Sequence, residues 1–199
     1  MLEIKNLAKS YEETGTLFEN ANLSLKKGEI IFLRGKSGSG KSQFLKAIIS
    51  LTPVDKGQIY FKGEETSEDN LPLLRSKIHY VSQNFPLQTG SVRDYLREPF
   101  NLKIYKNKKY TLDMPERFLN KKLALLSGGE RQMVHLKRSL SLEPEILLLD
   151  EPISAMDPET KEEAITLIRK FLEGGGAVIW VTHDPPPIEG KVLNFPEFG

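Results

Sequence analysis

Cysteine is absent from this 199-residue sequence. Its absence excludes a disulfide scaffold, a thiol nucleophile and a cysteine-ligated zinc site. An excess of either charge is also missing, because 28 Lys and Arg face 27 Asp and Glu and the formal net charge is +1. General nucleic-acid binders are usually strongly basic, so we expect no direct contact with nucleic acid. The composition, 39% hydrophobic and 28% charged, is typical of a globular protein.

Long hydrophobic runs are missing as well. The longest apolar runs, at 30–33, 146–149 and 177–181, have four or five residues. A membrane-spanning helix needs about 20 mainly apolar residues. The first residues also lack the basic and then apolar pattern of a secretory signal. If this protein acts at a membrane, we therefore expect it to do so through a partner.

The short apolar runs predict the strands of a mainly parallel sheet, because Gly or Pro punctuates their ends and buried strands read as continuous apolar stretches. Residues 158–172 have apolar side chains at helical spacing, with Asp157 as N-cap, Pro158 in the first turn and glycines at 174–176. Residues 1–27 predict short strands of an antiparallel sheet. Strands that alternate with helices indicate an α/β fold in a single domain.

A glycine-rich phosphate loop follows the first predicted parallel strand. It matches the pattern Gly, four residues, Gly-Lys-Ser, and an apolar helix is predicted after it. Glycines let the backbone N–H groups turn toward phosphates, and the helix N-terminus adds a partial positive charge. A chance Gly-Ser loop is the alternative, which the flanking strand and helix disfavour. The loop consists of Gly35, Lys36, Ser37, Gly38, Ser39, Gly40, Lys41 and Ser42.

Two carboxylates follow the apolar run 146–149. Asp150 and Glu151 would lie at the carboxyl end of a buried strand, where open α/β sheets bind ligands. Asp150 could hold Mg²⁺, and Glu151 could polarise an attacking water. The alternative is that this acidic pair only begins a turn or helix at Pro152.

The three histidines differ in their sequence context. His183 follows the third predicted parallel strand and would reach the same edge as the carboxylates, although such a residue can equally be a hydrogen-bonded loop histidine. His79 is interpreted as a strand residue, and His135 is interpreted as a helix-surface residue.

The segment 126–130, Leu-Ser-Gly-Gly-Glu, precedes another predicted helix. A serine and two glycines ahead of a helix can form a second anion site. Ser127 with Glu130 three residues later is also a capping box, so a purely structural role is an alternative.

Charge is unevenly distributed along the chain. Residues 93–122 contain nine basic and four acidic side chains, whereas residues 143–163 contain eight acidic and one basic. Two solvated faces would explain this pattern. A basic helical lobe that faces a partner or lipid headgroups would explain it as well.

Together these motifs resemble the nucleotide-binding subunit of ATP-binding cassette (ABC) transporters over nearly the whole chain. The phosphate loop, a glutamine at Gln83, the signature at 126–129, the carboxylate pair, a loop ending at Asp157 and His183 occur in the family's order. The resemblance implies an α/β P-loop NTPase fold with a mainly parallel sheet, an N-terminal antiparallel β-subdomain and an inserted α-helical subdomain. Residues 1–199 would form one domain, with a catalytic core at about 1–83 and 141–199 and the helical subdomain at about 84–140.

The resemblance also implies which residues do the chemistry. Glu151 would act as general base, His183 as γ-phosphate sensor and Lys41 as electrostatic clamp in ATP hydrolysis. Tyr11 would stack on the adenine ring. The other expected contacts are those of the phosphate loop and Gln43 with ATP, of Ser127, Gly128 and Gly129 with the ATP of a second subunit, and of Ser42, Gln83 and Asp150 with Mg²⁺.

In this family two subunits pack head to tail around ATP, so the resemblance implies an ATP-dependent homodimer in which Asp157 bridges to the opposite phosphate loop. It also implies an integral-membrane permease that docks on the helical subdomain, so that the protein would be cytoplasmic and peripheral at the inner face of the cell membrane. The leading hypothesis is thus the ATPase subunit of a transporter. The alternatives are a soluble ABC ATPase of DNA repair or translation and a nonhydrolytic nucleotide-dependent binding module.

The sequence departs from the family pattern at several positions. Gln43 stands where the family usually has Thr or Ser, which puts the α-phosphate contact in doubt. Met133 replaces a common Arg, and three prolines at 185–187 make a helix after His183 unfavourable. The compact helical subdomain and short C-terminus are similar to a small bacterial subgroup associated with metal or iron export.

Overall fold

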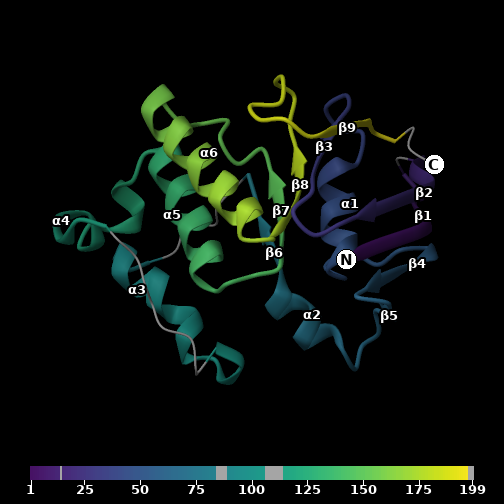
Figure 1. The fold of residues 1–199 in the computed structure, drawn as a ribbon, viewed down its shortest axis with the longest axis horizontal. Helices are drawn as coiled ribbons and strands as arrows, with labels where there is room; N and C mark the ends of the chain where they lie inside the picture. Colours follow the sequence, from purple (N-terminus) through teal and green to yellow (C-terminus); the bar gives the residue numbers. More distant parts are fainter. Residues whose placement is uncertain (14, 84–88, 106–113, 197–199) are drawn as a thin grey trace.

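Strands and helices alternate along the chain as the sequence predicts (Figure 1). The computed structural model describes residues 1–13, 15–83, 89–105 and 114–196. The strands are β1 (Leu2–Tyr11), β2 (Gly15–Leu25), β3 (Ile30–Arg34), β4 (Lys56–Phe61), β5 (Glu64–Glu65), β6 (Ile78–Val81), β7 (Ile146–Asp150), β8 (Ala177–Val181) and β9 (Lys191–Asn194). The α-helices are α1 (Lys41–Ile48), α2 (Leu71–Lys77), α3 (Val92–Arg97), α4 (Glu116–Leu119), α5 (Gly128–Ser141) and α6 (Pro158–Glu173), and the 3-10 helices are η1 (Glu98–Asn101), η2 (Lys103–Tyr105) and η3 (Leu123–Leu125).

Within the described residues, a parallel sheet has the strand order β6-β7-β8-β3-β9. The three apolar runs are confirmed as β3, β7 and β8, and every residue of β7 and β8 is buried. Successive side chains of a strand point to opposite faces. Accordingly, Ile31 and Ile179 belong to one apolar cluster, while their neighbours Phe32 and Trp180 belong to another on the opposite face. The sheet is therefore the middle layer of the core.

A second, antiparallel sheet has the order β2-β1-β4-β5 and packs on one side of the parallel sheet. Leu2, Leu7 and Phe18 from this sheet share an apolar cluster with Phe44 of α1. Strands β1 and β2 have 10 and 11 residues, longer than the short strands that the sequence predicts. The pairing of β1 with β2 contains three register shifts. Such irregularities let strands bend, so the two strands stay paired where the sequence predicts that they end.

The helix predicted at 158–172 is confirmed as α6, which extends one residue further. The Asp157 side chain accepts hydrogen bonds from the backbone N–H groups of Glu159 and Thr160, at 3.1 and 3.0 Å, and the helix ends at Glu173, before Gly174. Residues 185–187 are not helical, as their prolines predict. Within the described ranges, no helix combines the length and apolarity that a membrane crossing requires.

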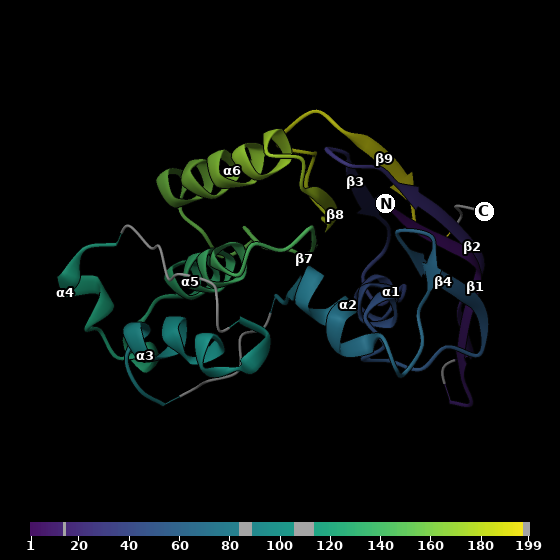
Figure 2. The same cartoon turned by 60° about the horizontal axis from the view of Figure 1, so that its bottom comes forward.

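Helices α3, α4 and α5 lie on the side of the parallel sheet away from the antiparallel sheet (Figures 1 and 2). They have an apolar cluster of their own, and α5 also packs against α6. The buried members of the cluster are Val92, Tyr95, Leu96, Leu119, Leu123, Leu126 and Val134. Helix α5 thus contributes Val134 to this cluster, and it contributes Met133 and Leu136 to the cluster that contains Phe32 and Trp180 of the parallel sheet.

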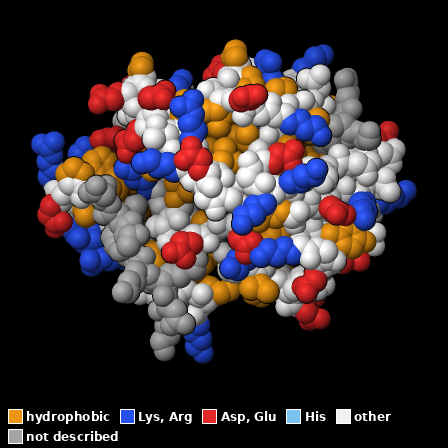
Figure 3. All heavy atoms as spheres, viewed as in Figure 1, with side chains coloured by type: hydrophobic (Ala, Val, Ile, Leu, Met, Phe, Trp, Pro, Cys, Tyr) orange, Lys and Arg blue, Asp and Glu red, His pale blue; other side chains and the backbone are white. Residues whose placement is uncertain are grey.

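The basic segment 93–122 is partly neutralised by acidic neighbours. Arg93 pairs with Glu116, and the Lys121 ammonium lies 2.8 Å from a carboxylate oxygen of Glu130. Figure 3 shows basic and acidic side chains interspersed on the face that it draws. These pairs favour the interpretation of a solvated, mixed-charge surface. Four of the segment's thirteen charged residues, Lys106, Lys108, Lys109 and Asp113, lie outside the described residues.

Two histidines contact the helices beside the parallel sheet, His79 from strand β6 and His135 from helix α5. His79 is a buried strand residue, as predicted, and its Nδ1 lies 3.2 Å from the carbonyl oxygen of Ser139 in α5. The prediction for His135 is wrong: it lies on α5, but the helix turns it toward α3, where its Nδ1 is 2.7 Å from the Tyr95 hydroxyl. Burial, aided by the nearby Arg138 cation, lowers the pKa of His135 to about 4.

Candidate active site

The phosphate loop leaves β3 and enters α1, which begins at Lys41. Its glycines have structural reasons to be glycine. Gly40 has φ of +97°, and a Cβ on Gly35 would lie 2.6 Å from the Phe195 carbonyl oxygen. The backbone therefore makes a tight curl that ends on a helix N-terminus, the arrangement that binds phosphate.

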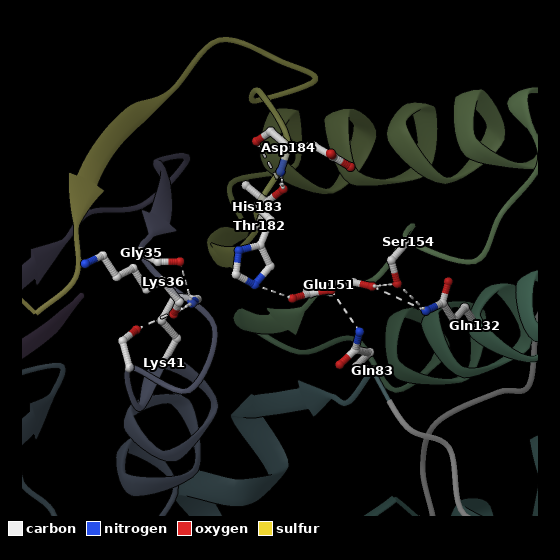
Figure 4. A network of polar contacts seen from close by, with 11 residues as sticks. Gly35, Lys36, Lys41, Gln83, Gln132, Glu151, Ser154, Thr182, His183 and Asp184 are labelled. Carbon is white, nitrogen blue, oxygen red and sulfur yellow. Dashed lines mark hydrogen bonds and ion pairs between the residues drawn. The ribbon is translucent and has the colours of Figure 1, made fainter. Parts of the chain in front are cut away.

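Lys41 curls back over this loop (Figure 4). Its ammonium donates hydrogen bonds to the carbonyl oxygens of Gly35 and Lys36, at 2.9 and 2.8 Å. Burial lowers the pKa of Lys41, while the carboxylates of Glu151 and Asp150 act in the opposite direction and favour the charged form. A buried cation is thus held at the loop, where phosphates would meet it.

Three neighbouring parallel strands bring the predicted catalytic side chains to one point. Glu151 directly follows β7, whereas His183 and Gln83 each lie two residues past the ends of β8 and β6. One carboxylate oxygen of Glu151 lies 2.9 Å from Nε2 of His183, and the other accepts a hydrogen bond of 2.8 Å from the Gln83 amide (Figure 4). The carboxyl edge of the sheet therefore assembles all three groups.

Asp150 ends β7 and is buried. Its Oδ2 accepts a hydrogen bond of 2.8 Å from the Tyr80 hydroxyl on β6. Burial raises the pKa of the Tyr80 hydroxyl, with the Asp150 carboxylate adding to the effect, so the hydroxyl stays a donor at neutral pH. Sequence reasoning missed Tyr80. The only available signal was its position three residues before Gln83 on a predicted strand.

A cleft of about 360 Å³ lies over the phosphate loop. Tyr11, which lies at the end of β1 and is 40% exposed, forms part of its wall. One cleft is therefore lined both by most of the residues predicted to contact the nucleotide and by Glu151, His183 and Gln83. Its lining residues are Tyr11, Leu17, Ser37, Gly38, Ser39, Gly40, Lys41, Ser42, Gln43, Gln83, Glu151, Val181 and His183.

Tyr11 is supported by residues that sequence reasoning did not single out. The Lys9 ammonium lies 4.8 Å from the centroid of the Tyr11 ring and 3.0 Å from an oxygen of Asp55. The other Asp55 oxygen accepts a hydrogen bond of 2.7 Å from the Ser10 backbone. Lys9 is buried, although lysine is usually exposed, and nothing in its local sequence marks it as part of a site.

The two unusual positions have clear local roles. Gln43 lines the cleft, and its side-chain oxygen accepts a hydrogen bond of 2.8 Å from the Thr52 hydroxyl. Met133 is buried in the apolar cluster beneath the parallel sheet. Position 133, where the family resemblance implies an arginine, is thus an apolar core contact in this protein.

The signature residues lie apart from this cleft, since none of Ser127, Gly128 and Gly129 lines it. They form the N-terminus of α5. The Ser127 hydroxyl accepts a hydrogen bond of 3.1 Å from the Glu130 N–H, and the Glu130 carboxylate accepts one of 2.9 Å from the Ser127 N–H. The capping box is therefore formed, and the segment leaves its helix N-terminus as a second candidate anion site within one chain.

Comparison with known proteins identifies the family. The sequence profile of ABC transporters matches residues 18–154. The chain is 35% identical over 180 residues to the probable iron export ATP-binding protein FetA of Escherichia coli K12, covering 86% of this chain and 80% of that protein. It is also 35% identical over 195 residues to the spermidine/putrescine import ATP-binding protein PotA of Clostridioides difficile 630, covering 92% of this chain and 55% of that protein.

Solved structures agree with the sequence relatives. The dimeric ATP-binding cassette MJ0796, in a post-hydrolysis state with ADP and Pi, superposes with a TM-score of 0.80 at 33% identity, covering 92% of this chain and 88% of that one. A second dimeric structure of MJ0796 has a TM-score of 0.81 with the same identity and coverage. The motifs, the P-loop NTPase fold and these relatives agree that the chain belongs to the ABC transporter family of ATP-binding proteins.

Proposed function

We propose that this protein binds and hydrolyses ATP and thereby powers a separate membrane permease. The observation that carries the proposal is the cluster of Glu151, His183 and Gln83 in the same cleft as the phosphate loop and Lys41. A cleft for phosphates alone needs only the loop. A carboxylate aimed into it by two donors adds the group that phosphoryl transfer to water requires.

ATP would lie with its adenine on the Tyr11 ring and its phosphates in the loop of residues 35–42. The backbone N–H groups and the helix N-terminus would bind the phosphate oxygens. Lys41 would exchange the carbonyl oxygens of Gly35 and Lys36 for the β- and γ-phosphates, which are stronger partners because they are anionic. Gln43 would reach the α-phosphate with its amide nitrogen, because its side-chain oxygen accepts the hydrogen bond from Thr52.

The oxygen atoms of the site fit Mg²⁺ as ligands, because Mg²⁺ prefers hard oxygen ligands and is bound through one or two carboxylates together with substrate phosphates. Asp150 supplies a carboxylate whose orientation Tyr80 fixes, and Ser42 and Gln83 supply further oxygens beside the phosphate loop. The described residues contain no cluster of three His, Asp or Glu side chains suited to a metal, so the ion would need the nucleotide to complete its shell. When bound, Mg²⁺ would neutralise charge on the β- and γ-phosphates.

Hydrolysis would depend on Glu151, which would accept a proton from the attacking water. His183 would hold the Glu151 carboxylate and contact the γ-phosphate, and Gln83 would hold the other carboxylate oxygen. No covalent intermediate with the protein is needed. Positioning and charge neutralisation supply the catalysis.

A second copy would complete each site. Residues 127–129 lie outside the cleft of their own chain, so we propose that they contact the γ-phosphate bound by the partner copy. The dimeric state of the 33% identical cassette MJ0796 supports this arrangement. Asp157 would bridge to the opposite phosphate loop. Its carboxylate caps α6, so any such bridge would have to share the cap.

The permease would dock on the helical subdomain, residues 84–140, and hold the protein at the inner face of the cell membrane. Metal or iron export is our proposal for the transported substrate, supported by the 35% identity to a probable iron export protein. Equal identity to a polyamine import protein means that the relatives alone do not select the substrate or the direction.

Phosphate release from Mg²⁺-ATP tests the proposal, with the permease present because isolated subunits can be weakly active. The wild-type protein is expected to release phosphate and the Lys41→Met variant is expected to release none. The ammonium is lost from Lys41→Met while most of the side-chain volume is kept. Binding without turnover would favour a nonhydrolytic module. Co-purification with ribosomes or nucleic acid, instead of a membrane protein, would favour a soluble ABC ATPase.

A further inference from the structure

Glu151 has a strained backbone. Its φ is +49°, in the left-handed region that residues with a Cβ rarely adopt. Such a conformation persists only where neighbouring groups hold it in place. The N–H of Glu151 donates to the carbonyl oxygen of Val181 in β8, at 3.0 Å, which fixes the residue from the sheet side.

The Glu151 carbonyl oxygen is held from the opposite side. It accepts hydrogen bonds from the backbone N–H and the hydroxyl of Ser154, at 3.3 and 3.0 Å. It also accepts one of 3.3 Å from Nε2 of Gln132. The Ser154 donors belong to the same turn as Glu151, whereas Gln132 belongs to the signature helix α5.

Gln132 uses both ends of its amide on this turn, and Figure 4 shows the bonds that its nitrogen makes. Its Nε2 also lies 3.2 Å from the Ser154 hydroxyl, and its Oε1 accepts a hydrogen bond of 3.1 Å from the Ala155 N–H. In the reverse orientation the NH2 group of Gln132 would face the Ala155 N–H, and two donors cannot bond to each other. The hydrogen-bond pattern therefore assigns the oxygen of the amide to Ala155 and the nitrogen to Glu151 and Ser154. The side chain is 6% exposed, so these bonds are shielded from water.

Packing brings α5 close to the same turn. A Cβ on Gly129 would lie 2.8 Å from the Ala155 carbonyl oxygen and 3.0 Å from the Met156 Cα. The N-terminal end of α5 therefore lies directly on residues 155–156, and the Gln132 amide locks it there. Helix α5 and the turn 151–156 are therefore held together by hydrogen bonds of Gln132 and by the close packing of Gly129.

We infer that Gln132 is a positioning residue for Glu151, so that the place of α5 sets the aim of the Glu151 carboxylate. The inference rests on the proposed function, in which Glu151 acts on water and residues 127–129 contact the partner's ATP. The helix that contacts ATP in one site then holds the base of the other site. Each ATP in the dimer is thereby coupled to hydrolysis of its neighbour.

The Gln132→Met variant tests this role, because Met has nearly the same volume and no amide. The expected result is a roughly tenfold fall in kcat, the effect of losing one or two buried hydrogen bonds. ATP affinity and the ATP-stabilised dimer are expected to stay within about twofold of wild type, since no ATP contact is removed. Ser141→Ala, at the far end of α5, is the matched control and is expected to keep kcat.

A second pair of variants addresses the same carbonyl and remains informative if Gln132→Met folds poorly. Ser154→Ala removes a hydroxyl donor and is expected to lower kcat, whereas Ser154→Thr keeps the hydroxyl and is expected to restore it. Wild-type kcat in a folded Gln132→Met variant overturns the inference, and so does wild-type kcat in Ser154→Ala if Gln132→Met does not fold. Loss of the dimer in parallel with kcat also overturns it, because α5 would then be displaced as a whole. If the wild-type protein itself has no turnover, the proposed function is what fails.

Discussion

Nε2 of His183 lies 2.9 Å from Oε1 of Glu151. These residues are 32 positions apart in the chain, and they meet because β7 and β8 are adjacent, parallel and in a register that pairs Asp150 with Val181. The Gln83 amide holds the other oxygen of the same carboxylate from β6. The two oxygens of the Glu151 carboxylate are therefore each held by a side chain that follows one of the two strands flanking β7.

Replacing His183 tests that relationship. His183→Ala removes one of the two donors and the proposed γ-phosphate contact, so kcat is expected to fall by about 100-fold or more. His183→Gln, whose amide can donate to Glu151, is expected to recover part of the loss. Steady-state phosphate release measures both variants. Wild-type kcat in His183→Ala would contradict the role given to the histidine.

Tyr80 is expected to act on metal affinity. Tyr80→Phe removes the hydroxyl that orients Asp150 and keeps the ring, and partners of metal ligands typically alter affinity by about 10- to 100-fold. The Mg²⁺ concentration for half-maximal ATPase activity should rise by at least about tenfold, with kcat restored at saturating Mg²⁺. Tyr60→Phe on β4 is the control. An unchanged Mg²⁺ dependence in Tyr80→Phe would remove Tyr80 from this role.

Lys9 is expected to strengthen adenine binding through Tyr11. Lys9→Met removes the cation 4.8 Å from the ring centroid, and such contacts contribute about 0.5–2 kcal/mol. ATP affinity should weaken roughly three- to tenfold, while inorganic triphosphate, which has no base, should bind as before. Isothermal titration measures both ligands.

Lys5→Met provides the matched control for Lys9→Met, because both lysines lie on β1. The Lys5 ammonium lies 4.7 Å from the centroid of the Tyr60 ring on β4, away from the cleft lining. The Lys5→Met variant should bind ATP like the wild-type protein. If Lys9→Met weakened triphosphate and ATP equally, the effect would come from the phosphate loop and the interpretation would be wrong.

His135 should make stability depend on pH. Its pKa is lowered to about 4 in the folded protein, below the ordinary value of about 6.5. The unfolded chain therefore binds the proton more readily, so stability is full above about pH 6.5 and falls as the pH drops toward about 4. At pH 5 the loss should be about 2 kcal/mol in the free energy of unfolding.

Urea unfolding at pH 7 and pH 5 measures this loss. His135→Gln keeps a polar side chain and does not titrate, so subtracting its pH dependence isolates the histidine from the carboxylates. The variant should lose less stability than the wild-type protein over this range. Equal losses in the two proteins would mean that His135 ionises as easily folded as unfolded.

Local patterns in the sequence predict much of this molecule. The strands β3, β7 and β8 follow from short apolar runs, and the phosphate loop follows from its glycine spacing, because both depend on residues close together in the chain. The capping box at Ser127 is visible for the same reason. The parallel strand order also brings Glu151 and His183 to one edge, as the sequence predicts.

Contacts between distant segments could not be predicted in the same way. Tyr80 supports Asp150, Lys9 supports Tyr11 and Gln132 holds the Glu151 turn only because the fold brings separate segments together. His135 was misassigned for the same physical reason. A helix pattern indicates which residues share a face, but not that α3 covers the face on which His135 lies.

The Glu151→Gln variant tests the central claim most directly. It removes the carboxylate that would accept the proton and keeps the shape of the side chain. Phosphate release and the mass of the protein in solution should be measured with Mg²⁺-ATP on the same sample. The account predicts no turnover, unchanged ATP binding and a dimer that persists as long as ATP is present. Turnover at the wild-type rate would contradict it.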